Sequence, residues 1–217
     1  MDAKEIIARR VAKEIKPDML VNLGIGLPSL VANYLPKDVH VFFQAENGVI
    51  GLGARPPEGM EDPDLTDAGG GFVTALPGAA SIDSAMSFGL IRGGHLDMTV
   101  LGGLEVDERG YLANWIVPGK MAPGMGGAMD LVTGARKVVV AMVHTAKGGH
   151  KIVERCSLPL TAVRRVSLIV TEMAVIEPTD VGLALRERGP GVSARQIQDA
   201  TGVRLIVERD PPEMALN

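Results

Sequence analysis

The chain alternates between short apolar runs and clusters of Gly, Pro and polar residues, and this pattern divides it into predicted helices and strands. Ile7, Val11 and Ile15 repeat every four residues and predict an opening helix that ends near Pro17. Apolar runs between turn signals predict strands. The predicted strands are 19–23, 39–45, 72–76, 96–101, 111–117, 137–143, 166–170, 174–176, 181–185 and 203–207. The other predicted helices are 28–34, 81–91, a short one entered at Gly126 and Gly127, and a short one after Ser193.

Strands that alternate with helices predict an α/β fold, in which a mostly parallel open sheet has helices on both faces. The segment from Lys137 to Val143 is almost wholly apolar, which is typical of a strand covered on both faces. Ser193 and Gln196 have the spacing of a capping box for the short helix that Gly202 ends. No linker, repeat or low-complexity tract interrupts the sequence, so we expect a single domain spanning residues 1–217.

The segment from Arg55 to Gly71 does not follow either period. It is rich in proline, glycine and acidic residues, and a patternless segment of this length in a compact domain is usually functional or disordered. Because it closely follows the turn at Glu46, we expect it to border a cleft there.

The amino-acid composition argues against several classes of protein function. Apolar residues make up 46% of the 217 residues and aromatic ones only 3%, so the core must consist mainly of aliphatic side chains and methionine. The net charge of -4, without a cluster of Lys and Arg, argues against a nucleic-acid partner. Cys156 is the only cysteine, which excludes a disulfide framework or a cysteine-based zinc site within one chain, and we expect no metal. Without an apolar leader or a run of membrane-spanning length, we expect a cytoplasmic protein with no membrane partner.

Glu46 raises the main chemical question, because it is a carboxylate between an apolar strand and the Asn47-Gly48 turn signal. The structural interpretation is a strand-end carboxylate that faces water or caps a hairpin turn, for which Asn-Gly supplies two residues that tolerate positive φ. The functional interpretation is a nucleophile held in a rigid turn. Such a carboxylate must be ionised to attack.

Two glycine turns are further candidates. Gly24-Ile25-Gly26 follows a predicted strand and precedes a helix, where main-chain N–H groups can cradle an anion, although a plain turn has the same pattern. Gly126 and Gly127 precede a short predicted helix, and their N–H groups either stabilise an oxyanion or simply form a turn. Three methionines have a four-residue spacing that is typical of core packing, a pocket or a subunit contact, and they are Met121, Met125 and Met129.

Glu46-Asn47-Gly48 resembles the catalytic Glu-Asn-Gly motif in the β subunit of class I CoA-transferases. Further segments over nearly the whole chain resemble landmarks of that family, and the succinyl-CoA:3-oxoacid type is the most similar. These segments are 22–28, 62–65 with 68–69, 76–79, 87–94, 112–115, 118–120, 124–131, 144–147 and 158–160.

The resemblance implies an enzyme that moves CoA from succinyl-CoA to a 3-oxo acid such as acetoacetate by a ping-pong mechanism. Glu46 is then the nucleophile that becomes a glutamyl-CoA thioester, and Gly127 is the oxyanion donor. CoA is a co-substrate, and no other cofactor is implied. The residues that the family pattern implies for CoA binding are Asn22, Gly24, Gly26, Asn47, Gly48, Gly126 and Ala128.

Alternatives stay open at this level. The same chemistry on 3-oxoadipate or a short-chain fatty acid is one, and a non-catalytic CoA-binding partner subunit is another, because a fold does not fix a function. Two positions depart from the family, which often has serine at Ala45 and lysine at Gly70. The family enzymes also need a second homologous half that this sequence lacks. We therefore expect a separately encoded β subunit that forms a heterotetramer with an α subunit.

Overall fold

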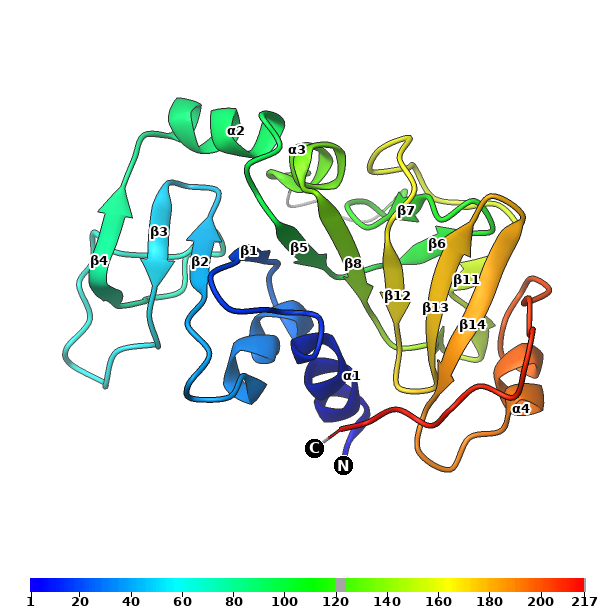
Figure 1. Ribbon diagram of the computed structural model, residues 1–217. Helices are drawn as coiled ribbons and strands as arrows, with labels where there is room; N and C mark the ends of the chain where they lie inside the picture. The colour runs from blue at the N-terminus through cyan, green and yellow to red at the C-terminus, as the bar shows by residue number, and fades with distance from the viewer. Residues whose placement is uncertain (120–123, 217) are drawn as a thin grey trace.

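One nine-stranded sheet forms the centre of the computed structural model, which describes residues 1–119 and 124–216 (Figure 1). The strand order is β14-β13-β12-β8-β5-β1-β2-β3-β4. The strands are β1 (Leu20–Leu23), β2 (Phe42–Ala45), β3 (Val49–Leu52), β4 (Ala75–Ser81), β5 (Met98–Leu101), β8 (Lys137–Ala141), β12 (Leu168–Val170), β13 (Ala174–Thr179) and β14 (Gly182–Arg188).

The five central strands β12, β8, β5, β1 and β2 run parallel, and two antiparallel strands extend the sheet at each end. This arrangement confirms the predicted α/β class, and the antiparallel ends are the difference from the expected sheet. Two smaller sheets accompany it. They contain β6 (Glu105–Asp107), β7 (Leu112–Ala113) and β11 (Ile152–Val153), and β9 (Thr145–Ala146) with β10 (Gly149–His150).

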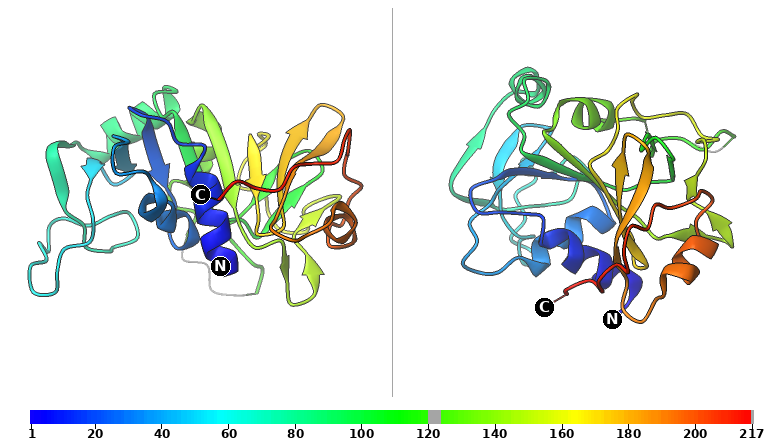
Figure 2. Two further views of the ribbon diagram at one scale, coloured as in Figure 1. Left: turned by 60° about the horizontal axis from the view of Figure 1, so that its bottom comes forward. Right: turned by 45° about the vertical axis from the view of Figure 1, so that its right-hand side comes forward.

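Helices cover both faces of the sheet, as expected (Figures 1 and 2). Strand β8 shows how the sequence achieves this, because Val139 and Ala141 pack into one core cluster while Val138 and Val140 pack into the other. The first cluster includes α1 (Ala3–Ala12) and the 3₁₀ helix η1 (Leu27–Tyr34), and the second includes α2 (Ser84–Arg92), α3 (Ala128–Gly134) and α4 (Ala194–Asp199). The capping box of Ser193 and Gln196 that starts α4 is confirmed.

Three predicted strands differ from the structure. The segment 203–207 is not a strand and contributes only an isolated bridge between Ile206 and Ala184, because its apolar pattern comes from burial of Leu205 against the core. The strand predicted at 72–76 begins at Ala75, where register with β3 starts, and the strand predicted at 111–117 shortens to β7. An apolar run indicates that its side chains are buried, whereas a strand also requires hydrogen-bonded pairing with a neighbouring strand.

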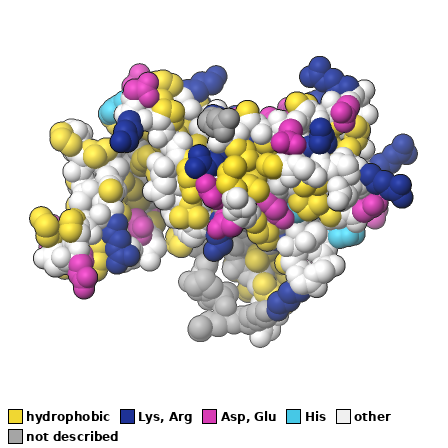
Figure 3. All heavy atoms as spheres, turned by 90° about the horizontal axis from the view of Figure 1, so that it is seen from below, with side chains coloured by type: hydrophobic (Ala, Val, Ile, Leu, Met, Phe, Trp, Pro, Cys, Tyr) yellow, Lys and Arg dark blue, Asp and Glu magenta, His cyan; other side chains and the backbone are white. Residues whose placement is uncertain are grey.

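The surface carries mixed charge on the face drawn in Figure 3, where acidic, basic and hydrophobic side chains are interspersed. Among the helices of the described residues, none has the length and hydropathy that crossing a bilayer would require. The single domain over residues 1–217 stays a prediction.

Candidate active site

Glu46 lies in a tight hairpin turn between β2 and β3. Ala45 pairs with Val49, and the N–H of Gly48 donates to the main-chain oxygen of Ala45 at 3.0 Å, so Glu46, Asn47 and Gly48 form the loop. Gly48 has φ of +124°, and a Cβ there would lie 2.0 Å from the main-chain oxygen of Ile82. Contrary to the two positive-φ residues expected from Asn-Gly, only the glycine uses that conformation, since Asn47 has an ordinary φ. The turn therefore fixes the chain on both sides of Glu46.

The turn places Glu46 at the carboxyl edge of the parallel sheet. It follows the end of β2, and the neighbouring strands β1 and β5 run in the same direction and end beside it. Gly24 follows the end of β1, where its N–H donates to the main-chain oxygen of Val100 at 2.8 Å. The predicted position at this edge is confirmed, and it is the edge at which open α/β sheets bind ligands.

Asn22 contacts the Glu46 carboxylate directly. Its Nδ2 donates to Glu46 Oε2 at 3.2 Å, and only 1% of the Asn22 side chain is exposed, whereas Glu46 is half-buried. One carboxylate oxygen of Glu46 is therefore held by a buried residue of the sheet, while part of Glu46 remains exposed to solvent.

Gly127 approaches the same carboxylate from α3. An ideal Cβ on this glycine would lie 3.1 Å from Glu46 Cγ and 3.2 Å from Oε1. Gly126, with φ of +56°, and Ala128 flank it at the start of the helix. Glu46 and Gly127 thus lie close together although 81 positions separate them in sequence (127 minus 46).

The methionines near this helix do not form a core stripe. Met129 is 49% exposed, so the core interpretation is wrong for it, and Met121 lies outside the described residues. The pocket or subunit-contact interpretation stays a prediction for Met125 and Met129.

The long loop from Arg55 to Gly71 contacts both the turn that contains Glu46 and the Gly24-Ile25-Gly26 turn. Asn47 Nδ2 donates to the main-chain oxygen of Thr66 at 2.8 Å. An ideal Cβ on Gly69 would lie 3.1 Å from Ile25 Cγ1, and Ile25 is 76% exposed. Gly26 has φ of +84°, and a Cβ added there would have no heavy atom within 4 Å. The loop therefore borders the site, as expected, while the binding roles of Gly24 and Gly26 stay predictions.

Three buried polar residues near Glu46 were missed in the sequence. Gln44, Thr99 and Ser87 are 2%, 0% and 0% exposed, and hydrogen bonds link them with Asn22. Their only sequence signal is a polar side chain at a strand or helix position that its neighbours predict to be buried.

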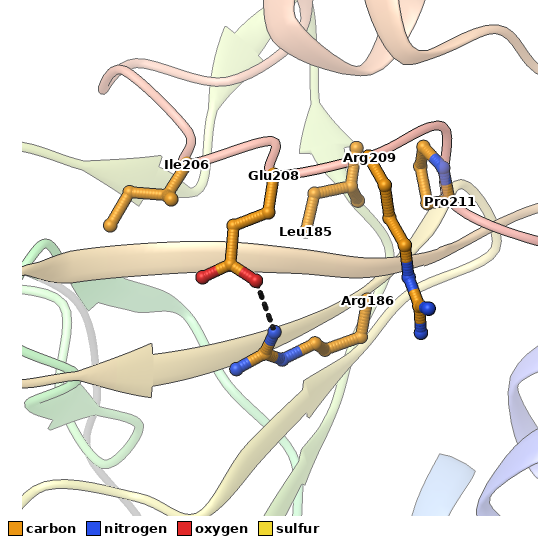
Figure 4. Close-up of a pocket in the computed structure, with 6 residues that line it drawn as sticks. All are labelled: Leu185, Arg186, Ile206, Glu208, Arg209 and Pro211. Atoms are coloured by element: carbon orange, nitrogen blue, oxygen red, sulfur yellow. Dashed lines mark ion pairs between the residues drawn. The ribbon is translucent and has the colours of Figure 1, made fainter.

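Other candidate sites in the described part of the molecule lack the groups that a reaction would need. The pocket in Figure 4 lies between β14 and the C-terminal segment 206–211, where Arg186 Nη1 and Glu208 Oε2 are 3.8 Å apart. None of the site residues predicted from the sequence lines it. Burial raises the pKa of the Cys156 thiol to about 12, so it is protonated at neutral pH and a poor nucleophile. Within the described residues, no group of three or more His, Cys, Asp or Glu side chains is placed to hold a metal ion.

Comparisons with known proteins identify the family of the chain. The family model for coenzyme A transferase matches residues 4–200, and the chain belongs to that family. It is 56% identical to the beta subunit of the acetate CoA-transferase of Escherichia coli K12, over 97% of this chain and 96% of that protein. The corresponding subunit of a probable succinyl-CoA:3-ketoacid coenzyme A transferase of Bacillus subtilis is 49% identical, over 96% and 97%. That of the 3-oxoadipate CoA-transferase of Pseudomonas putida is 48% identical, over 92% and 94%.

The fold has a counterpart among solved structures. An acyl-CoA transferase from Escherichia coli O157:H7 superposes with a TM-score of 0.76 at 21% identity, over 99% of this chain. This chain spans only 44% of that longer chain. The predicted membership among CoA-transferase β subunits is therefore confirmed, and the three relatives differ in the substrate that their names give.

Proposed function

We propose that this chain is the nucleophile-bearing subunit of a CoA-transferase that works through a glutamyl-CoA thioester on Glu46. The observation that carries this proposal is the placement of one carboxylate in a rigid turn, where Asn22 Nδ2 donates to it at 3.2 Å and Gly127 lies against its other oxygen. A carboxylate held in this way is preorganised for attack on an acyl carbon.

The reaction transfers CoA first from the donor acyl group to Glu46 and then from Glu46 to the acceptor acid. A Glu46 oxygen attacks the thioester carbonyl of a donor acyl-CoA, the C–S bond breaks, and a mixed anhydride and a CoA thiolate result. The thiolate then attacks the glutamyl carbonyl, which releases the donor acid and leaves the glutamyl-CoA thioester. An acceptor carboxylate reverses both steps and leaves as the new acyl-CoA, while Glu46 returns to its carboxylate form. The N–H of Gly127 is our candidate for stabilising the oxyanion in these steps.

Mass mapping of peptides tests the covalent step. The complex of this chain with its α subunit is treated with acetyl-CoA or succinyl-CoA in the absence of acceptor, and a CoA adduct is expected on the peptide that contains Glu46. Glu46→Gln should form no adduct because a neutral amide is a poor nucleophile. Glu46→Asp moves the carboxylate by about 1 Å and should lose on the order of 100-fold in rate. An adduct on Glu58, or turnover without any adduct, would contradict the proposal.

We propose an α subunit as the partner that completes the site. The longer solved relative, of which this chain matches less than half, supports a second half. Strand β4 supports it too, because six of its seven residues are exposed at the end of the sheet although none is charged, and Leu76 is 43% exposed. The purified single chain should therefore be inactive until the α subunit is added, and full turnover by the chain alone would overturn this part.

Two acceptor classes follow from the relatives. The resemblance favours a 3-oxo acid such as acetoacetate with succinyl-CoA as donor, whereas the relatives named for acetate favour a short-chain fatty acid. The loop from Arg55 to Gly71 contains five acidic residues and one basic one, and Gly70 stands where the family often has lysine, so the cation that would pair with a second carboxylate of succinate or 3-oxoadipate must come from elsewhere. A panel of acetate, butyrate, acetoacetate and 3-oxoadipate separates these classes by kcat/KM. Cytoplasmic location stays a prediction.

A further inference from the structure

A row of polar side chains crosses the sheet beneath the candidate nucleophile. Thr99 in β5, Asn22 in β1 and Gln44 in β2 are register partners on three adjacent parallel strands, so their side chains lie on the same face. All three are at least 98% buried, and the next register partner in β8 is the apolar Val138. Buried polar groups are costly unless they are paired, so the pairing of this row indicates what it does.

Hydrogen bonds join the row to Glu46 at one point and to helix α2 at another. Thr99 Oγ1 donates to Asn22 Oδ1 at 3.2 Å, and Asn22 Nδ2 donates to Gln44 Oε1 at 3.3 Å as well as to Glu46 Oε2. Gln44 Nε2 then donates to Ser87 Oγ at 2.8 Å, and Ser87 is fully buried in α2. The carboxylate is therefore connected through Asn22 and Gln44 to a helix on the face of the sheet.

The direction of this chain of bonds is fixed by groups that can only accept. Asn22 Nδ2 also donates to the main-chain oxygen of Gln44 at 3.1 Å, and a carbonyl oxygen has no proton to give. The nitrogen end of the Asn22 amide must therefore face β2, which makes Gln44 Oε1 the acceptor and leaves Gln44 Nε2 to face Ser87. The two N–H groups of Asn22 serve three acceptors, so Gln44 Oε1 constrains how Asn22 is directed at Glu46.

We infer that Gln44 and Ser87 are positioning residues for the transfer reaction. They hold the Asn22 amide, and through it the Glu46 carboxylate, at the angle from which Glu46 attacks the acyl carbon. This inference rests on the proposed role of Glu46 as nucleophile. Neither residue needs to touch substrate, and their effect belongs to the covalent step because a small misplacement of a reacting group is costly there.

Three variants separate positioning from stability. Gln44→Met keeps an unbranched side chain of similar size without polar ends, and the Ser87 hydroxyl can then bond within its own helix. Ser87→Ala instead leaves the buried Gln44 Nε2 without its acceptor, so it should be the least stable variant. The double variant removes that orphaned donor and should regain stability. Thr201→Val is the matched control, because it deletes a buried hydroxyl whose partners are His144 and the main-chain oxygen of Ile197.

The experiment measures single-turnover formation of the CoA adduct from acetyl-CoA and succinyl-CoA, with the KM for donor and the melting temperature, in the complex with the α subunit. Gln44→Met, Ser87→Ala and the double variant should each form the adduct roughly 10- to 100-fold more slowly, with unchanged KM, whatever their stability. Thr201→Val should lower the melting temperature without slowing the adduct. A Gln44→Met rate equal to wild type, or a double variant whose rate recovers with its stability, would overturn the inference.

Crystal structures of the wild-type and Gln44→Met complexes give a readout that does not depend on the reaction. The Glu46 carboxylate should move away from Asn22 in the variant, and an unmoved carboxylate would also overturn the inference. If the wild-type complex forms no adduct at all, the proposed function fails, and these structures still decide whether Gln44 positions Glu46.

Discussion

Asn22 Nδ2 in β1 lies 3.2 Å from Oε2 of Glu46, the residue that follows the adjacent parallel strand β2, and the two residues are 24 positions apart in sequence. Asn22 is buried and Glu46 follows the last residue of its strand, so the contact fixes one carboxylate oxygen from inside the sheet. The other oxygen faces Gly127. The nucleophile candidate is thus held between a strand and the start of a helix, and each contact can be changed separately.

Substitution of Asn22 should separate its hydrogen bond from its packing. Asn22→Ala removes the donor and should reduce kcat by roughly 10- to 100-fold, since the carboxylate loses its anchor. Asn22→Asp has the same shape but puts a second carboxylate beside Glu46, and two like charges this close disfavour joint ionisation. We therefore expect the aspartate variant to be the slower one at pH 7. If Asn22 served packing alone, the isosteric aspartate would be the milder change, and steady-state kinetics decide this.

Gly127→Ala should slow the enzyme through one added methyl group. The backbone at Gly127, with φ of -81° and ψ of 2°, accepts alanine without strain. The new Cβ would lie 3.1 to 3.3 Å from three atoms of Glu46, so the side chain must shift by a few tenths of an ångström. We expect about a tenfold loss of kcat.

Gly89→Ala is the matched control for that change. Gly89 lies within α2 and has no atom within 4 Å of the added Cβ, so alanine there should leave the rate unchanged and raise stability by up to about 1 kcal/mol. A wild-type rate for Gly127→Ala would mean that the observed contact is not the productive position of Glu46.

The sequence predicted the central architecture because periodicity, caps and apolar runs are local signals. The opening helix, the buried strand β8 and the capping box at Ser193 all follow from neighbouring residues, and the structure confirms them, although the opening helix ends at Ala12 and not near Pro17. Segment 203–207 failed because an apolar run buried as a loop looks the same as a strand. The antiparallel ends of the sheet were beyond local reasoning, because they depend on which strands pair.

The site shows the same limit. Local pattern placed Glu46 at the end of a strand but could not distinguish a nucleophile from a water-facing carboxylate, and only the family resemblance favoured the former. The polar row of Thr99, Asn22 and Gln44 exists because three strands lie in one register, and register cannot be read from a single strand.

Asn47→Ala should loosen the long loop from the site. It removes the hydrogen bond to the main-chain oxygen of Thr66, which is worth about 1 kcal/mol. The loosened loop should then leave the glutamyl anhydride and the glutamyl-CoA thioester more accessible to water. We expect hydrolysis of the donor acyl-CoA relative to transfer to rise by up to about fivefold. Glu58→Ala is the control, because this exposed loop residue should change neither quantity. An unchanged hydrolysis-to-transfer ratio in Asn47→Ala would show that the loop does not exclude water through this contact.

His144 should make the stability of the chain depend on pH. The ring is fully buried, with Nδ1 2.8 Å from Thr171 Oγ1 and Nε2 2.9 Å from Thr201 Oγ1. Burial lowers the pKa of His144 to about 4, with a further contribution in the same direction from the positive charges of His150 and Lys151. The unfolded chain, with an ordinary histidine pKa near 6.5, therefore binds the proton more tightly than the folded chain.

The sign of the effect follows from this difference. Above about pH 6.5 both states hold a neutral ring, and the contribution of His144 to the free energy of unfolding is fully present. It is lost as pH falls from about 6.5 to about 4, by about 3 kcal/mol in total.

His144→Gln offers both hydroxyls a donor and an acceptor but does not titrate in this range. Urea denaturation followed by Trp115 fluorescence should therefore give a smaller loss of stability between pH 7 and pH 4.5 for this variant than for wild type. His40→Gln, at a side chain that is 62% exposed, should keep the wild-type pH profile. Parallel profiles for His144→Gln and wild type would mean that another group causes the acid sensitivity of the fold.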